Sequence, residues 1–241
     1  MKNETHPAHG DDSDPKLRHA DSLTAALWES AVDTFDQILA HPFLRGVADG
    51  TLEQERFAFF LAQDGHYVRS YTQCLATLAG RAPDEETVNM LVSHAAGAIG
   101  LESALHAELI ESMGMNYTTV ISVGPSPTTE AYRNALLATC ERASFLEALV
   151  SLLPCYWIYA RVGNQLQKVE SPNPVYARWI ENYSGGDYEK AVNEVLNCVD
   201  QLGHTASAPE VNRCIALYRR GAQYEWMFWD AAHRQETWPI G

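Results

Sequence analysis

Apolar residues recur three and four positions apart along most of the chain, which is the pattern of amphipathic helices. No stretch alternates between apolar and polar residues for long enough to indicate a strand, and no internal repeat is present. The fold is therefore predicted to be all-α. The spacing predicts helices over residues 22–40, 52–80, 83–113, 129–141, 144–168, 175–182, 188–202 and 210–233.

Polar, Gly-rich and Pro-rich stretches separate these segments. Residues 1–20 carry almost no apolar side chains, so we expect a disordered tail there and a single helical domain over 21–241. Residues 115–128 form the longest predicted connection, and a second break lies at 171–174.

Charge and cysteine content narrow the partners and the compartment. The chain has 241 residues and a formal net charge of −14, so we expect neither nucleic acid nor an anionic membrane as a partner. No signal peptide and no run of eighteen apolar residues is recognisable, which favours a cytoplasmic protein. The five cysteines are widely spaced and contain no C-x-x-C pair, which argues against disulfides and a structural zinc site.

One run of residues suggests chemistry. Residues 152–159 read Leu-Leu-Pro-Cys-Tyr-Trp-Ile-Tyr, which places Cys155 directly after a proline inside an apolar helix. Proline in a helix interior removes a backbone donor and costs about 3 kcal/mol, so it tends to persist where a kink is useful. A free cysteine is also a common core residue, and packing alone is the competing interpretation.

Two acids share this aromatic setting. Asp64 lies on the same helical face as Phe60 and Tyr67, and Glu225 lies within Tyr-Glu-Trp-Met-Phe-Trp. Burying either carboxylate costs free energy unless a partner binds it. An acid at the margin of its helix would instead remain in contact with water. If the helices bring the thiol and both acids together, the site suits a flat aromatic ligand, with a cysteine to attack it and a glutamate to move protons.

Several short motifs resemble the thiaminase II (TenA) family over roughly residues 22–238. They occur in the family's order: His-Pro-Phe at 41–43, Gly-Thr-Leu at 50–52, Gln-Asp at 63–64, Pro-Ser-Pro-Thr at 125–128, Leu-Leu-Pro-Cys-Tyr-Trp at 152–157 and Tyr-Glu-Trp-Met-Phe-Trp at 224–229. The resemblance implies a haem-oxygenase-like helical bundle without haem, with a central ligand pocket. It also implies a homotetramer and hydrolysis of aminopyrimidines in thiamin salvage, with no cofactor and no metal.

The same resemblance implies roles for individual residues. Cys155 would be the nucleophile, Glu225 the acid/base and Asp64 the ligand of the pyrimidine ring. The pocket tyrosines would be Tyr67, Tyr132, Tyr159 and Tyr183. The substrate would be 4-amino-5-aminomethyl-2-methylpyrimidine, thiamin itself or a related degradation product. The chain departs from the family pattern at Gly65, His66 and Arg161, which bears on substrate preference.

Two other functions are compatible with the sequence. Glu102 and His106 lie four residues apart, a spacing that can place two metal ligands on one helical face, so a metal-dependent oxidase with the same fold is one alternative. An internal or surface hydrogen-bonded pair explains the same spacing. A non-catalytic binder of thiamin-like or tetrapyrrole ligands is the other alternative, and in that case Cys155 would be dispensable.

Overall fold

The computed structural model describes residue 14 and residues 18–240, apart from the side chains of residues 101–103. The described residues form helices and no strands, which confirms the all-α prediction. The helices are α1 (Leu23–Glu29), α2 (Val32–Leu39), α3 (Pro42–Asp49), α4 (Gln54–Ala79), α5 (Glu85–Ser112), α6 (Tyr117–Ile121), α7 (Pro127–Arg142), α8 (Phe145–Leu166), the 3-10 helix η2 (Gln167–Val169), α9 (Pro174–Ser184), α10 (Gly186–Gly203) and α11 (Ala208–Arg234).

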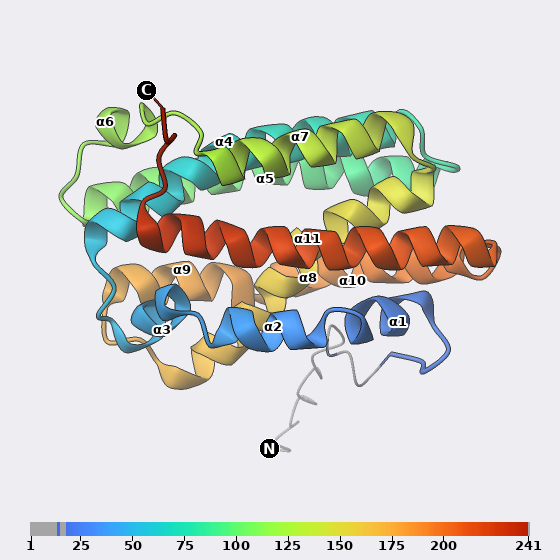
Figure 1. Cartoon of the computed structure of the whole chain (residues 1–241), viewed down its shortest axis with the longest axis horizontal. Coiled ribbons are helices and arrows are strands. Elements are labelled where there is room, and N and C mark those ends of the chain that lie inside the picture. Colours follow the sequence, from blue (N-terminus) through green and yellow to red (C-terminus); the bar gives the residue numbers. More distant parts are fainter. Residues whose placement is uncertain (1–13, 15–17, 241) are drawn as a thin grey trace, which may run out of the picture.

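The long helices lie in layers around α8 (Figure 1). In this view α4, α5 and α7 form the upper layer, α11 crosses the middle, and α1 to α3 run along the lower edge. Helix α8 packs against α7, α9, α10 and α11, and α4 packs against α5, α7 and α11. Side chains from α4, α7, α8, α9 and α11 therefore meet in the interior.

Helix α8 is the central element of the core. Nearly all its residues are buried, the exceptions being Phe145, Cys155, Asn164 and Gln165. The segment Phe145–Val169, which includes α8, is long and apolar enough to cross a membrane. An 18-residue window within it has a mean hydropathy of 1.3, but 83% of that window is buried inside the fold. A buried core helix has the same composition, so this feature gives only weak support for a membrane span.

Helix starts follow from the local sequence. Ser144 accepts a hydrogen bond from the Glu147 amide while the Glu147 carboxylate accepts one from the Ser144 amide, which makes a capping box at the start of α8. Asp84 caps α5 and Ser126 caps α7, each by accepting a hydrogen bond on its side chain from the amide three residues later, and proline occupies the first turn of α7.

Two expectations about the elements were wrong in detail. The segment predicted as one helix over 22–40 is divided into α1 and α2, because the Ser30 hydroxyl donates to the Leu27 carbonyl and Ala31 leaves the helical region at φ −127°. The chain also forms α3, which begins at Pro42, where no helix was expected. His41 caps that helix by accepting from the Phe43 amide, and Gly50 ends it with φ +77°.

Side chains of α4 and the C-terminal segment hold the end of the connection before α7. Gln63 donates to the Gly124 carbonyl at 3.0 Å and accepts from the Ser126 amide at 2.8 Å. The Trp238 indole donates to the Pro125 carbonyl at 3.0 Å. The earlier half of this connection forms α6, which has no buried residue.

Much of the predicted tail lies outside the described residues. Of the part that is described, Arg18 donates to the Asn197 side chain at 3.0 Å and lies 3.5 Å from the Asp200 carboxylate. Asp14 lies 3.7 Å from the Arg161 guanidinium. These contacts connect the chain before α1 to α8 and α10.

Candidate active site

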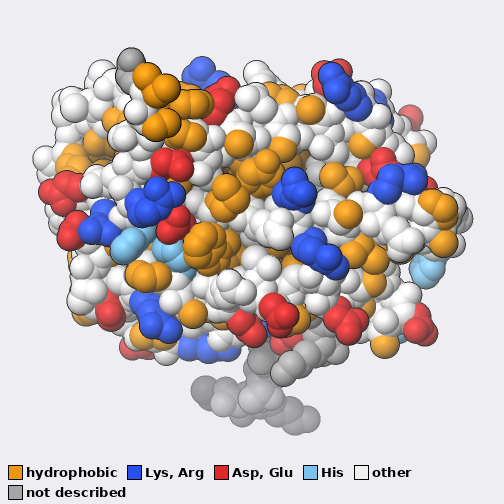
Figure 2. All heavy atoms as spheres, viewed as in Figure 1, with side chains coloured by type: hydrophobic (Ala, Val, Ile, Leu, Met, Phe, Trp, Pro, Cys, Tyr) orange, Lys and Arg blue, Asp and Glu red, His pale blue; other side chains and the backbone are white. Residues whose placement is uncertain are grey.

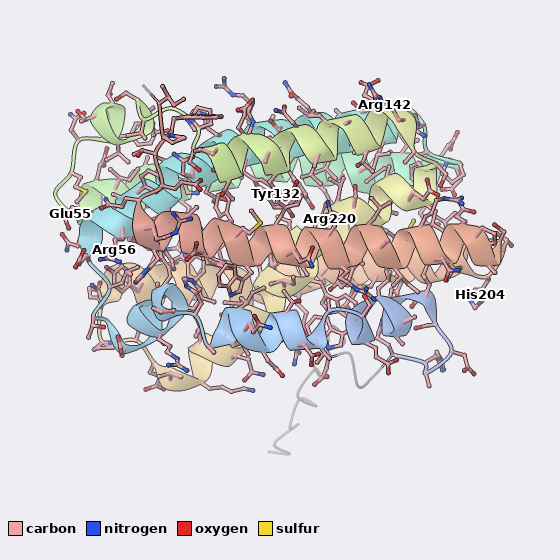
Figure 3. All side chains as sticks on the ribbon, viewed as in Figure 1. Glu55, Arg56, Tyr132, Arg142, His204 and Arg220 are labelled. Atoms are coloured by element: carbon pink, nitrogen blue, oxygen red, sulfur yellow. The ribbon has the colours of Figure 1, made fainter. Side chains whose placement is uncertain are left out.

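Glu225 projects from α11 into the interior, with an exposed fraction of 2%. The Tyr132 hydroxyl donates a hydrogen bond to one Glu225 carboxylate oxygen at 2.7 Å. Figure 3 shows Tyr132 between α7 and α11, on the side of α7 that faces α11. Burial raises the pKa of Glu225 from 4.5 to about 8, with a further increase from the charge of Asp64 and an opposing effect from the Tyr132 hydrogen bond. A carboxyl group with a pKa near neutrality suits proton transfer in both directions.

Asp64 lies on α4 and is 3% exposed. Its Oδ2 atom is 2.9 Å from Nε2 of His106, which is buried on α5. This contact with His106 therefore offsets part of the free-energy cost of burying the Asp64 carboxylate, and it fixes the orientation of that side chain. Asp64 lies one helical turn before Tyr67, whose ring packs against Tyr132, the donor to Glu225. The two acids are therefore connected through two side chains although they are far apart in sequence.

The four predicted pocket tyrosines form two adjoining walls. Rings of Tyr67 and Tyr132 lie 4.9 Å apart, and rings of Tyr159 and Tyr183 lie 5.0 Å apart. Burial raises the pKa of Tyr159 well above its ordinary range, and the nearby acids and Cys155 raise it further. Burial also raises the pKa of Tyr67 and Tyr132 well above the ordinary range, and the charges of Glu225 and Cys155 raise both further. These hydroxyls are therefore neutral donors at physiological pH.

Cys155 is half-buried on α8, directly after Pro154. It lines a cavity of about 400 Å³ between α4, α5, α8 and the junction of α9 with α10. Cys155 lies one helical turn before Tyr159 on α8, and its carbonyl accepts a hydrogen bond from Tyr188, whose ring contacts Tyr183, so it lies beside the wall formed by Tyr159 and Tyr183. The structure thus groups in one region the seven residues singled out from the sequence: Asp64, Tyr67, Tyr132, Cys155, Tyr159, Tyr183 and Glu225. Of these seven, only Cys155 lines the cavity of about 400 Å³.

Additional aromatic rings complete the walls. Phe228 packs against Tyr67 with ring centroids 5.9 Å apart, and Trp229 packs against Tyr159 at 5.1 Å. Tyr224, which is half-buried, stacks on the buried Tyr132 with ring centroids 4.8 Å apart and planes at 10°. These α11 aromatics were not among the site residues predicted from the sequence. The helical spacing of Phe228 and Trp229, three and four residues after Glu225, was the signal that could have identified those two.

The three departures from the family pattern do not lie inside the walls. Gly65 is exposed on the outer side of α4. His66 makes a 2.7 Å hydrogen bond with the Val123 carbonyl in the connection before α7. Arg161 is buried on α8, where it faces Asp14.

Of the predicted helical pair Glu102 and His106, the structure describes the side chain of His106 alone. Nε2 of His106 is engaged by Asp64, a partner on another helix that the spacing of four residues could not indicate. The side chain of Glu102 lies outside the described residues. Within the described part of the chain, no group of three or more His, Cys, Asp and Glu side chains is placed to hold a metal ion.

Known proteins resemble this chain along most of its length. Residues 28–235 match the profile of the TENA/THI-4/PQQC family. An aminopyrimidine aminohydrolase of Bacillus subtilis (strain 168) is 31% identical over 217 residues, which cover 90% of this chain and 89% of that protein. The thiamine biosynthesis multifunctional protein ThiED of Corynebacterium efficiens is 36% identical over 222 residues, which cover 92% of this chain but only 30% of that longer protein.

Solved structures agree with these relatives. A TenA homologue from P. horikoshii OT3 superimposes with a TM-score of 0.82 at 26% identity, over 88% of this chain and 99% of that one. A domain with a heme oxygenase-like fold from Shewanella denitrificans superimposes with a TM-score of 0.69 at 19% identity, over 90% of this chain and 94% of that one. The predicted haem-oxygenase-like helical fold is confirmed.

Proposed function

The chain belongs to the TENA/THI-4/PQQC family, and from this premise we propose that it is an aminopyrimidine aminohydrolase (thiaminase II) of thiamin salvage. The substrate we assign is 4-amino-5-aminomethyl-2-methylpyrimidine, with thiamin as a second substrate. The observation that carries the proposal is a buried carboxyl group, Glu225, which accepts a hydrogen bond from Tyr132 at 2.7 Å and whose pKa burial raises to about 8. No cofactor takes part in the proposed reaction.

Each residue has one task in the proposed mechanism. The Asp64 carboxylate accepts hydrogen bonds from the amino-substituted ring, while the four tyrosines Tyr67, Tyr132, Tyr159 and Tyr183 enclose it. The Cys155 thiolate adds to an electron-poor ring carbon, and the displaced electron pair is held by the ring nitrogens. The exocyclic C–N bond then breaks, and the leaving amine takes its electron pair and a proton from Glu225.

Water completes the reaction. It adds to the exposed methylene carbon and gives a proton to the Glu225 carboxylate, which restores the acid. The ring then expels Cys155 as thiolate and regains its aromaticity. The net change is replacement of the amino group by a hydroxyl group, with ammonia as the second product.

Incubation with each candidate substrate tests this function. We expect 4-amino-5-hydroxymethyl-2-methylpyrimidine to accumulate, as measured by chromatography with mass detection, and Cys155→Ser to abolish its formation. Turnover that is retained by Cys155→Ser would contradict the nucleophile. Metal analysis of the purified protein addresses the oxidase alternative, because stoichiometric iron together with no hydrolysis would favour it.

We also propose that the protein is a cytoplasmic homotetramer. Support comes from the family resemblance, and from exposed apolar side chains such as Val92 and Ile99 on α5, which are 53% and 58% exposed. Apolar side chains also reach the surface in several places on the face shown in Figure 2. Light scattering should give about four times the 26.8 kDa chain mass. A monomer at micromolar concentration would overturn this assignment.

A further inference from the structure

The helical turn that carries Cys155 lacks part of its own hydrogen bonding. Pro154 lies inside α8 and has no amide hydrogen, so the carbonyl four residues earlier loses its helical partner. A turn weakened in this way would let the following thiol vary in position. Placement within roughly 0.5 Å matters at a reacting centre, since a displacement of about 1 Å can reduce a rate about 100-fold.

Two tyrosine hydroxyls from other helices bind the backbone of this turn. Tyr71 on α4 donates to the Leu152 carbonyl at 3.2 Å, and that bond is buried. Tyr188 on α10 donates to the Cys155 carbonyl itself at 3.1 Å. Both rings also line the cavity of about 400 Å³ beside the thiol. The turn is therefore held from two sides by groups outside α8.

Each of these tyrosines also packs against a tyrosine of one of the pocket walls. Tyr71 stacks on Tyr67 with centroids 5.6 Å apart and planes at 27°. Tyr188 meets Tyr183 edge-on at 5.2 Å and 89°. A substrate ring bound between the walls would therefore contact Tyr67 and Tyr183, which pack against the two tyrosines that bind the Cys155 turn.

We propose that Tyr71 and Tyr188 are positioning residues that fix the Cys155 turn against the bound ring. The kinetic test of this inference rests on the proposed hydrolase function, whereas its second test, alkylation of Cys155, depends on the geometry alone. Neither hydroxyl needs to touch the substrate, because each is directed at a carbonyl of α8. Their effect should therefore fall on the chemical step and leave binding nearly unchanged.

The chain offers a matched control. Tyr176 is a buried tyrosine on α9 whose hydroxyl donates to the Leu52 carbonyl at 2.7 Å, outside the candidate site. Tyr176→Phe removes the same kind of bond as Tyr71→Phe or Tyr188→Phe and retains the ring. All three substitutions should lower the melting temperature to a similar, small extent.

The experiment compares kinetics and thiol chemistry across these variants. We expect kcat to fall between about 10-fold and 100-fold in Tyr71→Phe and Tyr188→Phe, with KM changed less than about threefold, and neither constant to change in Tyr176→Phe. Alkylation of Cys155 by iodoacetamide, followed by peptide mass spectrometry, should be faster in the two site variants, because a loosened turn exposes the half-buried thiol more often.

The outcomes separate the two proposals. An inactive wild-type protein would remove the hydrolase function, but the alkylation comparison would still test the positioning role. An active wild type, with both site variants matching Tyr176→Phe in kcat and alkylation rate, would overturn the positioning role alone. A rise in KM with unchanged kcat would also overturn it, since that result would make the hydroxyls binding groups.

Discussion

A close contact between α8 and α11 allows a quantitative test of the packing around the candidate nucleophile. Gly221 on α11 is buried against Pro154. A Cβ atom at this position would lie 2.5 Å from Pro154 Cγ and 3.3 Å from Pro154 Cβ, whereas carbon atoms in favourable contact are about 3.5–4.0 Å apart. Gly221→Ala therefore requires the two helices to separate by about 1 Å, since the proline ring has little freedom to move away.

Two opposing effects set the size of the change. Replacing glycine by alanine in a helix interior favours folding by about 1 kcal/mol, while overpacking a core costs about 1–3 kcal/mol. The net loss should be up to about 2 kcal/mol, with each kcal/mol lowering the melting temperature by about 2–4 °C in a chain of this length. Because Cys155 follows Pro154 directly, we expect kcat to fall as well.

Gly100→Ala is the matched control. Gly100 is exposed on α5, and a Cβ atom there would have no neighbour within 4 Å, so only the helix preference acts and the variant should be more stable. Thermal unfolding followed by circular dichroism compares the two. Equal stabilisation by both substitutions would refute the claim that α8 and α11 are in tight contact at Pro154.

Three further predictions concern the acids and the thiol. Cys155→Ser should lower kcat at least about 1000-fold while leaving helicity and much of the ligand binding intact, and near-normal turnover would make Cys155 a packing residue. Asp64→Asn should weaken substrate binding by about 1.5–3 kcal/mol in a titration, because it exchanges a charged acceptor for a donor, and unchanged affinity would remove the ring-binding role. For Glu225 the folded pKa of about 8 exceeds the unfolded 4.5, so the folded state holds the proton more tightly. Its contribution to stability should be complete below pH 4.5 and should be lost at up to about 1.4 kcal/mol per pH unit as the pH rises to about 8, and Glu225→Gln should flatten this slope in denaturant titrations.

The sequence predicted the long helices well, because their apolar periodicity persists over many turns. It missed α3 and α6, which are short and begin at local caps provided by His41 and Asn116. It also joined α1 to α2, since the Ser30 side chain bond that separates them leaves the apolar spacing unchanged. Short-range polar contacts decided these boundaries.

The candidate site could likewise be predicted only in part from the sequence. Residues within one helix, such as Asp64 and Tyr67, could be grouped from their spacing. The convergence of Cys155 and Glu225 on that group rested on resemblance, because spacing carries no information about contacts between helices. For the same reason the bond between His106 and Asp64, and those of Tyr71 and Tyr188 to α8, became visible only in three dimensions.

The connection between α5 and α7 has consequences for protein engineering. Gln63, the residue before Asp64, holds both Gly124 and Ser126, so lengthening the chain between those two positions would pull on the helix that carries the acid. Residues 118–122 lie on the surface, where α6 has no buried residue and its cap Asn116 precedes it. An affinity tag or a fluorescent protein inserted there would be accommodated at the surface, whereas the same insertion six residues later would disturb the pocket.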